Sequence, residues 1–187
     1  RLEHVLIHRP GAELEQLTPS RLEHMLFDDI PFVTGAQKEH DAFAQALKKE
    51  GVTVHYLVDL ITETLSQDEK IKIDFIEDFI SLSGQSAIYH SKEIRTLLLN
   101  FENTRDMVIK TMTGINLDKL KSDTPHQLAK LVRQESPFVT LPMPNLYFTR
   151  DPMASIGHGA SLSSMYAPTR KRESLYSKYI LDRKSVV

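Results

Sequence analysis

The chain has 187 residues and a formal net charge of -2 at pH 7, which fits one domain with a sizeable core. A hydrophobic share of 41% and a charged share of 26% argue against disorder, and the lack of basic excess argues against nucleic acid as a partner. There is no cysteine, which excludes disulfides, thiolate metal sites and a thiol nucleophile in this chain. Without a long apolar run or a signal-peptide core, no membrane association is expected, and we predict a soluble cytoplasmic protein.

The first quarter of the chain predicts strand, helix and strand in that order. Apolar residues between 2 and 7 indicate a short strand, which "RPG" ends. The Thr-Pro pair at 18–19 predicts the start of a short helix, with the Thr18 hydroxyl as its cap. Helical spacing of apolar and small residues predicts a longer helix over 35–50, and Gly51 ends it. Alternation in "VTVHYL" (52–57) predicts the second strand.

The middle of the chain is predicted to be helical. Apolar pairs between 67 and 82 form a broad face at helical spacing, which is typical of core packing rather than of a ligand site. Three further helix starts follow, at Ser91, at Asn103 (with Gly114 after the helix) and at Thr124-Pro125. These signals predict a helical block, about 65–135, inserted between strand-rich ends.

Strand signals return after Pro137, in "FVT" (138–140), "LYF" (146–148), "MASI" (153–156) and "ASLSSMY" (160–166). Glycines 157 and 159 predict a tight hairpin between the last two. From Pro168 onward a helix is predicted, with Leu175 and Tyr179 on one side. Arg170 and Arg172 fall near its start, where cations oppose the helix dipole, so an arginine there is expected to have another task. The whole pattern predicts an α/β protein.

General catalytic signatures are missing from the sequence. The eight histidines include no HExxH or HxxEH pair, so neither a metal nor a cofactor is expected. No glycine-rich phosphate loop and no GxSxG elbow occurs.

One segment, "NLYFTRDP" (145–152), does indicate a binding chemistry. A planar guanidinium is held well by a carboxylate fork and an aromatic face, and Asp151 and Phe148 supply both groups. The alternative from spacing alone is an aspartate that caps the turn into Pro152.

A longer set of motifs resembles a known family. "PMPNLYFTRDP" (142–152), together with "RPGAELEQLTP" (9–19), "MLFDDIP" (25–31), "QKEHDAFAQALKKEGV" (37–52) and "TRKRESLYSKYI" (169–180), is similar to bacterial arginine deiminase. The likeness runs from about Leu2 to Ile180. It implies a pentein-like α/β propeller of ββαβ blades with a helical insertion, of which this chain carries about two of five blades. It also implies an arginine-catabolic hydrolase that converts L-arginine to L-citrulline and ammonia.

The resemblance assigns roles to five residues. Asp151 matches the catalytic aspartate that grips the substrate guanidinium, and Phe148 matches the aromatic side chain beside it. Asn145 and Arg170 match residues that hold the amino-acid end of the substrate, with Arg170 as a carboxylate clamp. Leu26 lies in a loop that lines or covers the site in the family.

The sequence also differs from the family pattern in ways that affect the expected activity. The family attacks the guanidinium carbon with a cysteine thiolate from its C-terminal half, which has no counterpart in this chain. The ending "LDRKSVV" (181–187) diverges from the family. We therefore hypothesise the N-terminal part of a split or degenerate enzyme, inactive alone, whose partner is a separately encoded C-terminal half or a second copy. The alternatives are a relic or module that binds arginine or a partner, and a related enzyme for agmatine or a methylated arginine.

Overall fold

The computed structural model describes residues 2–120, 137–157 and 159–183. The helix predicted after Thr124-Pro125 lies outside these residues, as does most of the divergent ending. Within the described part the protein is a mixed α/β structure, which confirms the predicted class at this level.

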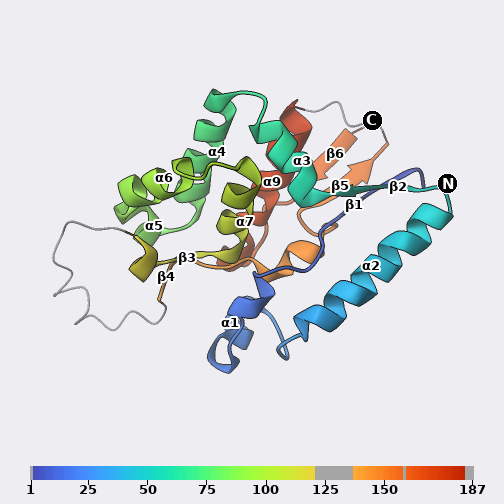
Figure 1. Cartoon of the computed structure of the whole chain (residues 1–187), viewed down its shortest axis with the longest axis horizontal. Coiled ribbons are helices and arrows are strands. Elements are labelled where there is room, and N and C mark those ends of the chain that lie inside the picture. Colours follow the sequence, from blue (N-terminus) through green and yellow to red (C-terminus); the bar gives the residue numbers. More distant parts are fainter. Residues whose placement is uncertain (1, 121–136, 158, 184–187) are drawn as a thin grey trace.

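A parallel βαβ unit opens the chain. Strand β1 (His4–Ile7) pairs in parallel with β2 (Thr53–Tyr56), and helix α2 (Val33–Lys49) connects them. Figure 1 shows α2 lying along this strand pair. Parallel strands require such a crossover, because a tight turn can join only antiparallel neighbours. Gly51 has a φ of 78° and ends α2 as predicted.

The segment before α2 differs in detail from its prediction. It forms two 3-10 turns, η1 (Leu14–Gln16) and η2 (Pro19–Arg21), and the short helix α1 (Leu22–Met25). The Thr18 hydroxyl does not cap the turn that follows it, and its oxygen lies 3.3 Å from the Ser20 hydroxyl instead. Leu14, Leu17 and Met25 bury their side chains in a small apolar cluster of their own.

A helical block follows β2 and holds the main core. Its helices are α3 (Leu57–Leu65), α4 (Glu69–Leu82), α5 (Gln85–Tyr89), α6 (Ser91–Leu99) and α7 (Thr104–Thr113). In both views α4, α5 and α6 gather at the end of the molecule away from α2. The predicted apolar face of 67–82 is confirmed, since Phe75, Ile76 and Phe79 are fully buried. Asn103 caps α7 by accepting a hydrogen bond from the Arg105 amide at 2.7 Å.

Gly114 turns the chain out of α7 into a second small sheet. Strand β3 (Ile115–Asn116), which continues into the turn η3 (Leu117–Lys119), pairs antiparallel with β4 (Phe138–Thr140). Gly114 has φ 82° and ψ 160°, a region that only glycine occupies readily. A Cβ atom there would lie 2.7 Å from the Thr140 carbonyl oxygen and 2.8 Å from the Pro142 nitrogen. This close approach places the segment after β4 directly against the end of α7.

The strand predicted for "LYF" (146–148) is wrong. The chain forms the 3-10 turn η4 (Pro144–Tyr147) there, because Pro144 fixes φ at the first helical position and has no N–H for a ladder. The apolar side chain of Leu146, which contributed to the strand prediction, packs into the main core and not onto a sheet.

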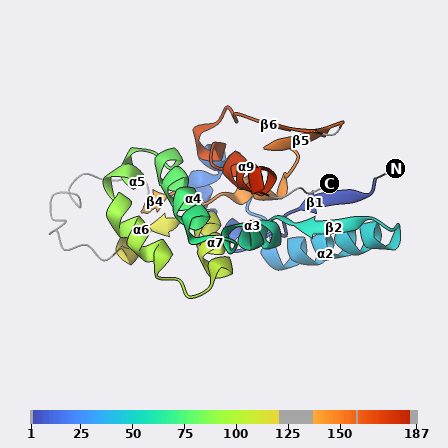
Figure 2. The same cartoon turned by 90° about the horizontal axis from the view of Figure 1, so that it is seen from above.

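The final elements are a hairpin and a helix. Strands β5 (Met153–Ile156) and β6 (Gly159–Leu162) pair antiparallel, which confirms the hairpin, although the strand predicted to Tyr166 ends at Leu162. The turn η5 (Pro168–Arg170) precedes helix α9 (Glu173–Arg183), so Arg170 lies just before the helix and not in its first turn. Leu175 and Tyr179, predicted to lie on one side of this helix, are both buried in the main core. Figure 2 shows the hairpin at the edge of the molecule beside α9.

Each of the sheets formed by the described residues has two strands. Among these residues no helix is long and apolar enough to cross a membrane, and no cluster of His, Asp and Glu could hold a metal ion.

Candidate functional site

The turn after β4 carries the side chains that the sequence predicts to bind a guanidinium. The amide of Phe148 donates to the Asn145 carbonyl at 3.0 Å, and the amide of Asp151 donates to the Phe148 carbonyl at 3.0 Å. The Thr149 hydroxyl ties this turn to β1 by donating to the Leu6 carbonyl at 2.8 Å. Two successive tight turns therefore present Phe148 and Asp151 in a fixed relation to each other.

Asn145 is buried and anchors the turn to the start of the chain. Its side-chain amide donates a 2.8 Å hydrogen bond to the carbonyl of Met25, the residue before Leu26. Leu26 ends α1 with a φ of 61°, and its side chain is 56% exposed. A non-glycine residue in the left-handed region is uncommon, and here it ends α1 with an apolar residue that is more than half exposed.

Asp151 and Arg170 form an ion pair. The Arg170 Nη1 donates to Asp151 Oδ2 at 3.0 Å, and the side chains of Arg170 and Asp151 are 13% and 46% exposed. The sequence predicts both residues as substrate-binding groups, and the structure brings them into direct contact. Half of the Asp151 side chain remains open to solvent, so this carboxylate is accessible to a ligand.

Glu173 binds the other edge of the Arg170 guanidinium, and it was not predicted as a site residue from the sequence. It accepts from Arg170 Nε at 3.0 Å and from Nη2 at 2.7 Å, and its side chain is only 1% exposed. The signal that could have found it is its position three residues after Arg170, at the start of a predicted helix. Arg170 thus lies between two carboxylates, one buried and one exposed.

The electrostatics of this trio follow from burial and pairing. Burial by itself would lower the pKa of Arg170, but the hydrogen bonds and charges of Glu173 and Asp151 outweigh it and raise that pKa. Burial raises the pKa of Glu173, while Arg170 opposes the change. The guanidinium therefore stays charged, and it is the partner that lets a carboxylate remain at a buried position.

Aromatic rings lie next to Asp151 in the chain. The rings of Tyr147 and Phe148 have centroids 4.0 Å apart, and Phe27 lies 6.3 Å from Tyr147. The Phe148 side chain is 43% exposed, so its ring is available to a ligand. Burial raises the pKa of Tyr147, and the charge of Arg170 acts against that rise. Among the five predicted residues, Asp151 and Arg170 are in direct contact, Asn145 and Phe148 belong to the turns that lead to Asp151, and Leu26 follows Met25, to which Asn145 bonds.

Arg172, the second arginine noted near the helix start, has a structural role. It is 2% exposed, donates to the Leu141 carbonyl at 2.7 Å and lies 5.4 Å from the Phe79 ring. Burial lowers the pKa of Arg172 to about 10. Arg172 therefore links Phe79 of α4 to Leu141, the residue that follows β4.

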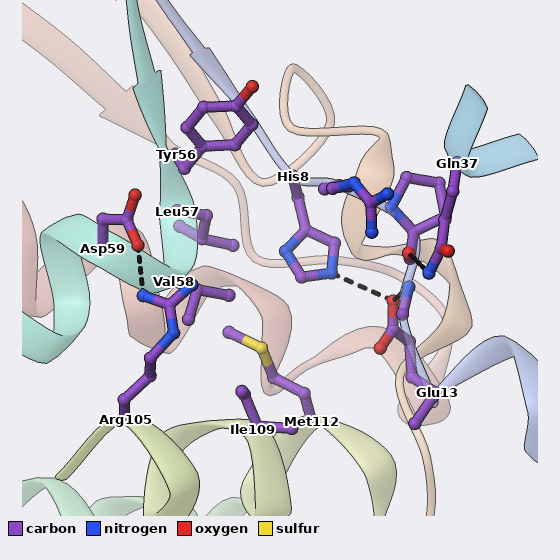
Figure 3. A pocket seen from close by; sticks show the side chains of 14 residues that line it. His8, Glu13, Gln37, Tyr56, Leu57, Val58, Asp59, Arg105, Ile109 and Met112 are labelled. Carbon is purple, nitrogen blue, oxygen red and sulfur yellow. Dashed lines mark hydrogen bonds and ion pairs between the residues drawn. The ribbon is translucent and has the colours of Figure 1, made fainter. Parts of the chain in front are cut away.

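A cavity of about 370 Å³ lies elsewhere, between the loop after β1, the start of α3 and helix α7. Figure 3 shows His8 and Glu13 on one side of it and Asp59 and Arg105 on the other. The five residues predicted from the sequence do not line this cavity. The predicted guanidinium-binding residues and this cavity are therefore separate features of the structure.

Comparisons with known proteins agree with the motifs. The family model described as arginine deiminase matches residues 23–185. An arginine deiminase of Streptococcus agalactiae is 50% identical over 182 residues, which are 96% of this chain and 44% of that protein. Arginine deiminases of Treponema denticola and Streptococcus sanguinis are 47% and 50% identical and are covered to the same 44%. The chain thus spans less than half the length of these relatives.

Proposed function

This chain belongs to the arginine deiminase family, and from that premise we propose that it supplies the substrate-gripping part of an enzyme that hydrolyses L-arginine to L-citrulline and ammonia. The single observation that carries the proposal is that Asp151 already accepts a guanidinium hydrogen bond, from Arg170 at 3.0 Å. In the proposal Asp151 takes the substrate guanidinium, with the exposed Phe148 ring beside it. This activity belongs to arginine catabolism in the cytoplasm.

The Asp151–Arg170 contact must open when arginine binds. Four carbon atoms separate the carboxylate of an arginine from its guanidinium, so the two protein side chains cannot hold opposite ends of it while 3.0 Å apart. In the proposed complex Arg170 pairs with the substrate carboxylate, and Asp151 pairs with the substrate guanidinium. Asn145, whose side chain also ties the turn to Met25, holds the amino-acid end of the substrate together with Arg170, and Leu26 lines or covers the site.

The nucleophile of this reaction has to come from outside the 187 residues. The chain contains no cysteine, so covalent attack by a thiolate requires a second polypeptide segment. We propose that a C-terminal half, equivalent to the part of the relatives that this chain does not cover, contributes it. In that assembly the chain forms about two of five blades of a pentein-like propeller, with the helical block from α3 to α7 as part of its insertion.

The β5–β6 hairpin supports the docking of such a segment. Its sheet has two strands, and between Asp151 and Arg170 the chain has no Lys, Arg, Asp or Glu. Ile156 and Tyr166 expose 67% and 103% of their surface. Uncharged, unprotected strand edges readily accept another strand, and isolated two-stranded hairpins are only marginally stable. A second copy of the chain is the competing occupant.

The test combines a binding and an activity measurement. We expect L-arginine to bind the purified chain, and citrulline to form only after mixing with the C-terminal part of the Streptococcus agalactiae relative. Asp151→Asn should abolish both, because it removes the charge opposite the guanidinium. Asp74→Asn is the matched control, since Asp74 forms an exposed pair with Lys70 on α4. Unchanged arginine affinity in Asp151→Asn would contradict the assignment.

The absence of cysteine also supports a second candidate, a module that binds arginine without converting it. In that case arginine binds and no citrulline appears in any mixture. A related enzyme for agmatine is distinguished by Arg170, because agmatine has no carboxylate to clamp. Equal affinity for agmatine and L-arginine would favour it.

A further inference from the structure

The cavity between β1 and α7 has the features of a second ligand site. Its volume of about 370 Å³ lies in the lower part of the range of small-molecule sites, about 300–1,000 Å³. Its floor is apolar, with Leu57, Val58, Ile109 and Met112 among the lining residues. Polar side chains lie on two opposite sides of this floor: His8 and Glu13 at an inner, buried position, and Asp59 and Arg105 at an outer, exposed position (Figure 3).

At the inner place, His8 and Glu13 form a buried pair. The side chains are 3% and 4% exposed, and His8 Nε2 lies 3.0 Å from Glu13 Oε1. The same oxygen accepts from the Gly11 amide at 2.7 Å, and a Cβ atom at Gly11 would lie 2.7 Å from Glu13 Oε2. Glycine at position 11 therefore leaves room for this carboxylate, which in turn fixes the orientation of the imidazole.

The second ring nitrogen of His8 has no partner. Among the described residues, Nδ1 is buried and makes no hydrogen bond, and Figure 3 shows it on the side of the ring that faces Leu57 and Val58. A carboxylate can only accept, so Nε2 carries the hydrogen and Nδ1 of the neutral ring is an acceptor. A buried acceptor without a partner is costly, and a donor from a ligand would satisfy it.

At the outer place, Asp59 and Arg105 form an ion pair whose side chains are 54% and 47% exposed. Asp59 follows β2 at the start of α3, and Arg105 lies at the start of α7. A carboxylate and a guanidinium side by side at the mouth are complementary to a molecule that carries both an ammonium and a carboxylate group.

We propose that this cavity binds a free α-amino acid whose side chain ends in a hydrogen-bond donor. The α-ammonium group pairs with Asp59 and the α-carboxylate with Arg105. The aliphatic part of the ligand covers the apolar floor, and its terminal donor reaches His8 Nδ1. This inference is independent of the proposed function, because it uses a different set of residues.

The probe is L-glutamine, which has a terminal amide donor and no guanidinium. It is titrated into the ¹⁵N-labelled chain, and backbone amide shifts are followed by NMR. We expect saturable shifts around Gly11 and Leu57. L-Norvaline, which lacks the donor, should bind about tenfold more weakly, as the loss of one buried hydrogen bond predicts.

Variants decide the assignment. His8→Gln keeps a donor toward Glu13 but moves the remaining acceptor away from the Nδ1 position to its amide oxygen, and Arg105→Gln removes the positive charge at the mouth. Each should weaken L-glutamine binding about tenfold, whereas His24→Gln on α1 and Asp151→Asn should leave it within about twofold. Dispersed spectra check that each variant folds. No saturable shifts in the wild type, or unchanged affinity in Arg105→Gln, would overturn the proposal.

Discussion

Gly114 offers a direct test of how the site is held in place. It ends α7 in a backbone region that only glycine occupies readily, and it lies against the backbone of Thr140 and Pro142. In Gly114→Ala, the strained backbone costs about 1–3 kcal/mol. The new Cβ at 2.7 Å and 2.8 Å from main-chain atoms adds an overpacking cost of about 1–3 kcal/mol.

Gly84 provides the matched control for this substitution. It has φ 94° and ψ 179°, the same strained region, but a Cβ there would meet nothing within 4 Å. Gly84→Ala therefore measures the backbone strain alone, and the difference between the two variants measures the contact. Urea unfolding followed by far-UV circular dichroism gives both free energies.

We expect Gly114→Ala to be destabilised by about 2–6 kcal/mol in total, a large part of a typical folding free energy of about 5–15 kcal/mol. It should also weaken arginine binding where it still folds, because the Met143 amide, next along this segment, donates to the Met112 carbonyl at 2.9 Å and leads into the Asn145 turn. If Gly114→Ala costs no more than Gly84→Ala, the close approach does not determine stability and the reasoning fails.

Two further variants test local interactions. Asn103→Ala removes the cap of α7 and should lower the free energy of unfolding by about 1 kcal/mol, measured by the same urea unfolding; a neutral result would mean that the hydrogen bond to the Arg105 amide adds no stability. Burial lowers the pKa of His40 from 6.5, and the neighbouring Asp41 opposes this. The unfolded chain therefore binds the proton first, and stability should fall as the pH drops through about 6.5. His40→Gln should reduce that loss between about pH 7.5 and about pH 5.5, and an unchanged slope would rule His40 out as its source.

Local patterns in the sequence predicted much of the fold. The strands at the two ends of the βαβ unit, helix α2, the apolar face of α4 and the Asn103 cap all follow from spacing and chain-end chemistry. The failures have local physical causes too. At "LYF" the prolines on either side favour a turn over a strand. Phe43 is one of the apolar residues whose helical spacing predicts α2, yet it is 54% exposed.

Contacts between distant parts of the chain could not be predicted from the sequence. The Asn145 side chain bonds to Met25, 120 residues earlier, and the unpaired nitrogen of His8 becomes notable only once Glu13 takes the other. The predicted site residues came from resemblance, and spacing alone could not separate a ligand carboxylate from a turn cap. The direct contact between Asp151 and Arg170 was not foreseen.

That contact indicates how the proposed site would open. Arg170 is held by Glu173 through Nε and Nη2, and only Nη1 is shared with Asp151. Glu173 is buried, whereas the Asp151 side chain is 46% exposed. Asp151 is therefore the partner that can move with the smaller loss of contacts. An incoming guanidinium replaces the charge-assisted hydrogen bond that Asp151 gives up with another of the same kind, so opening the pair costs little, whereas Asp151→Asn would leave the substrate guanidinium without its charge partner. The Phe148 ring and the released Nη1 of Arg170, which meets the substrate carboxylate, add to the affinity for arginine.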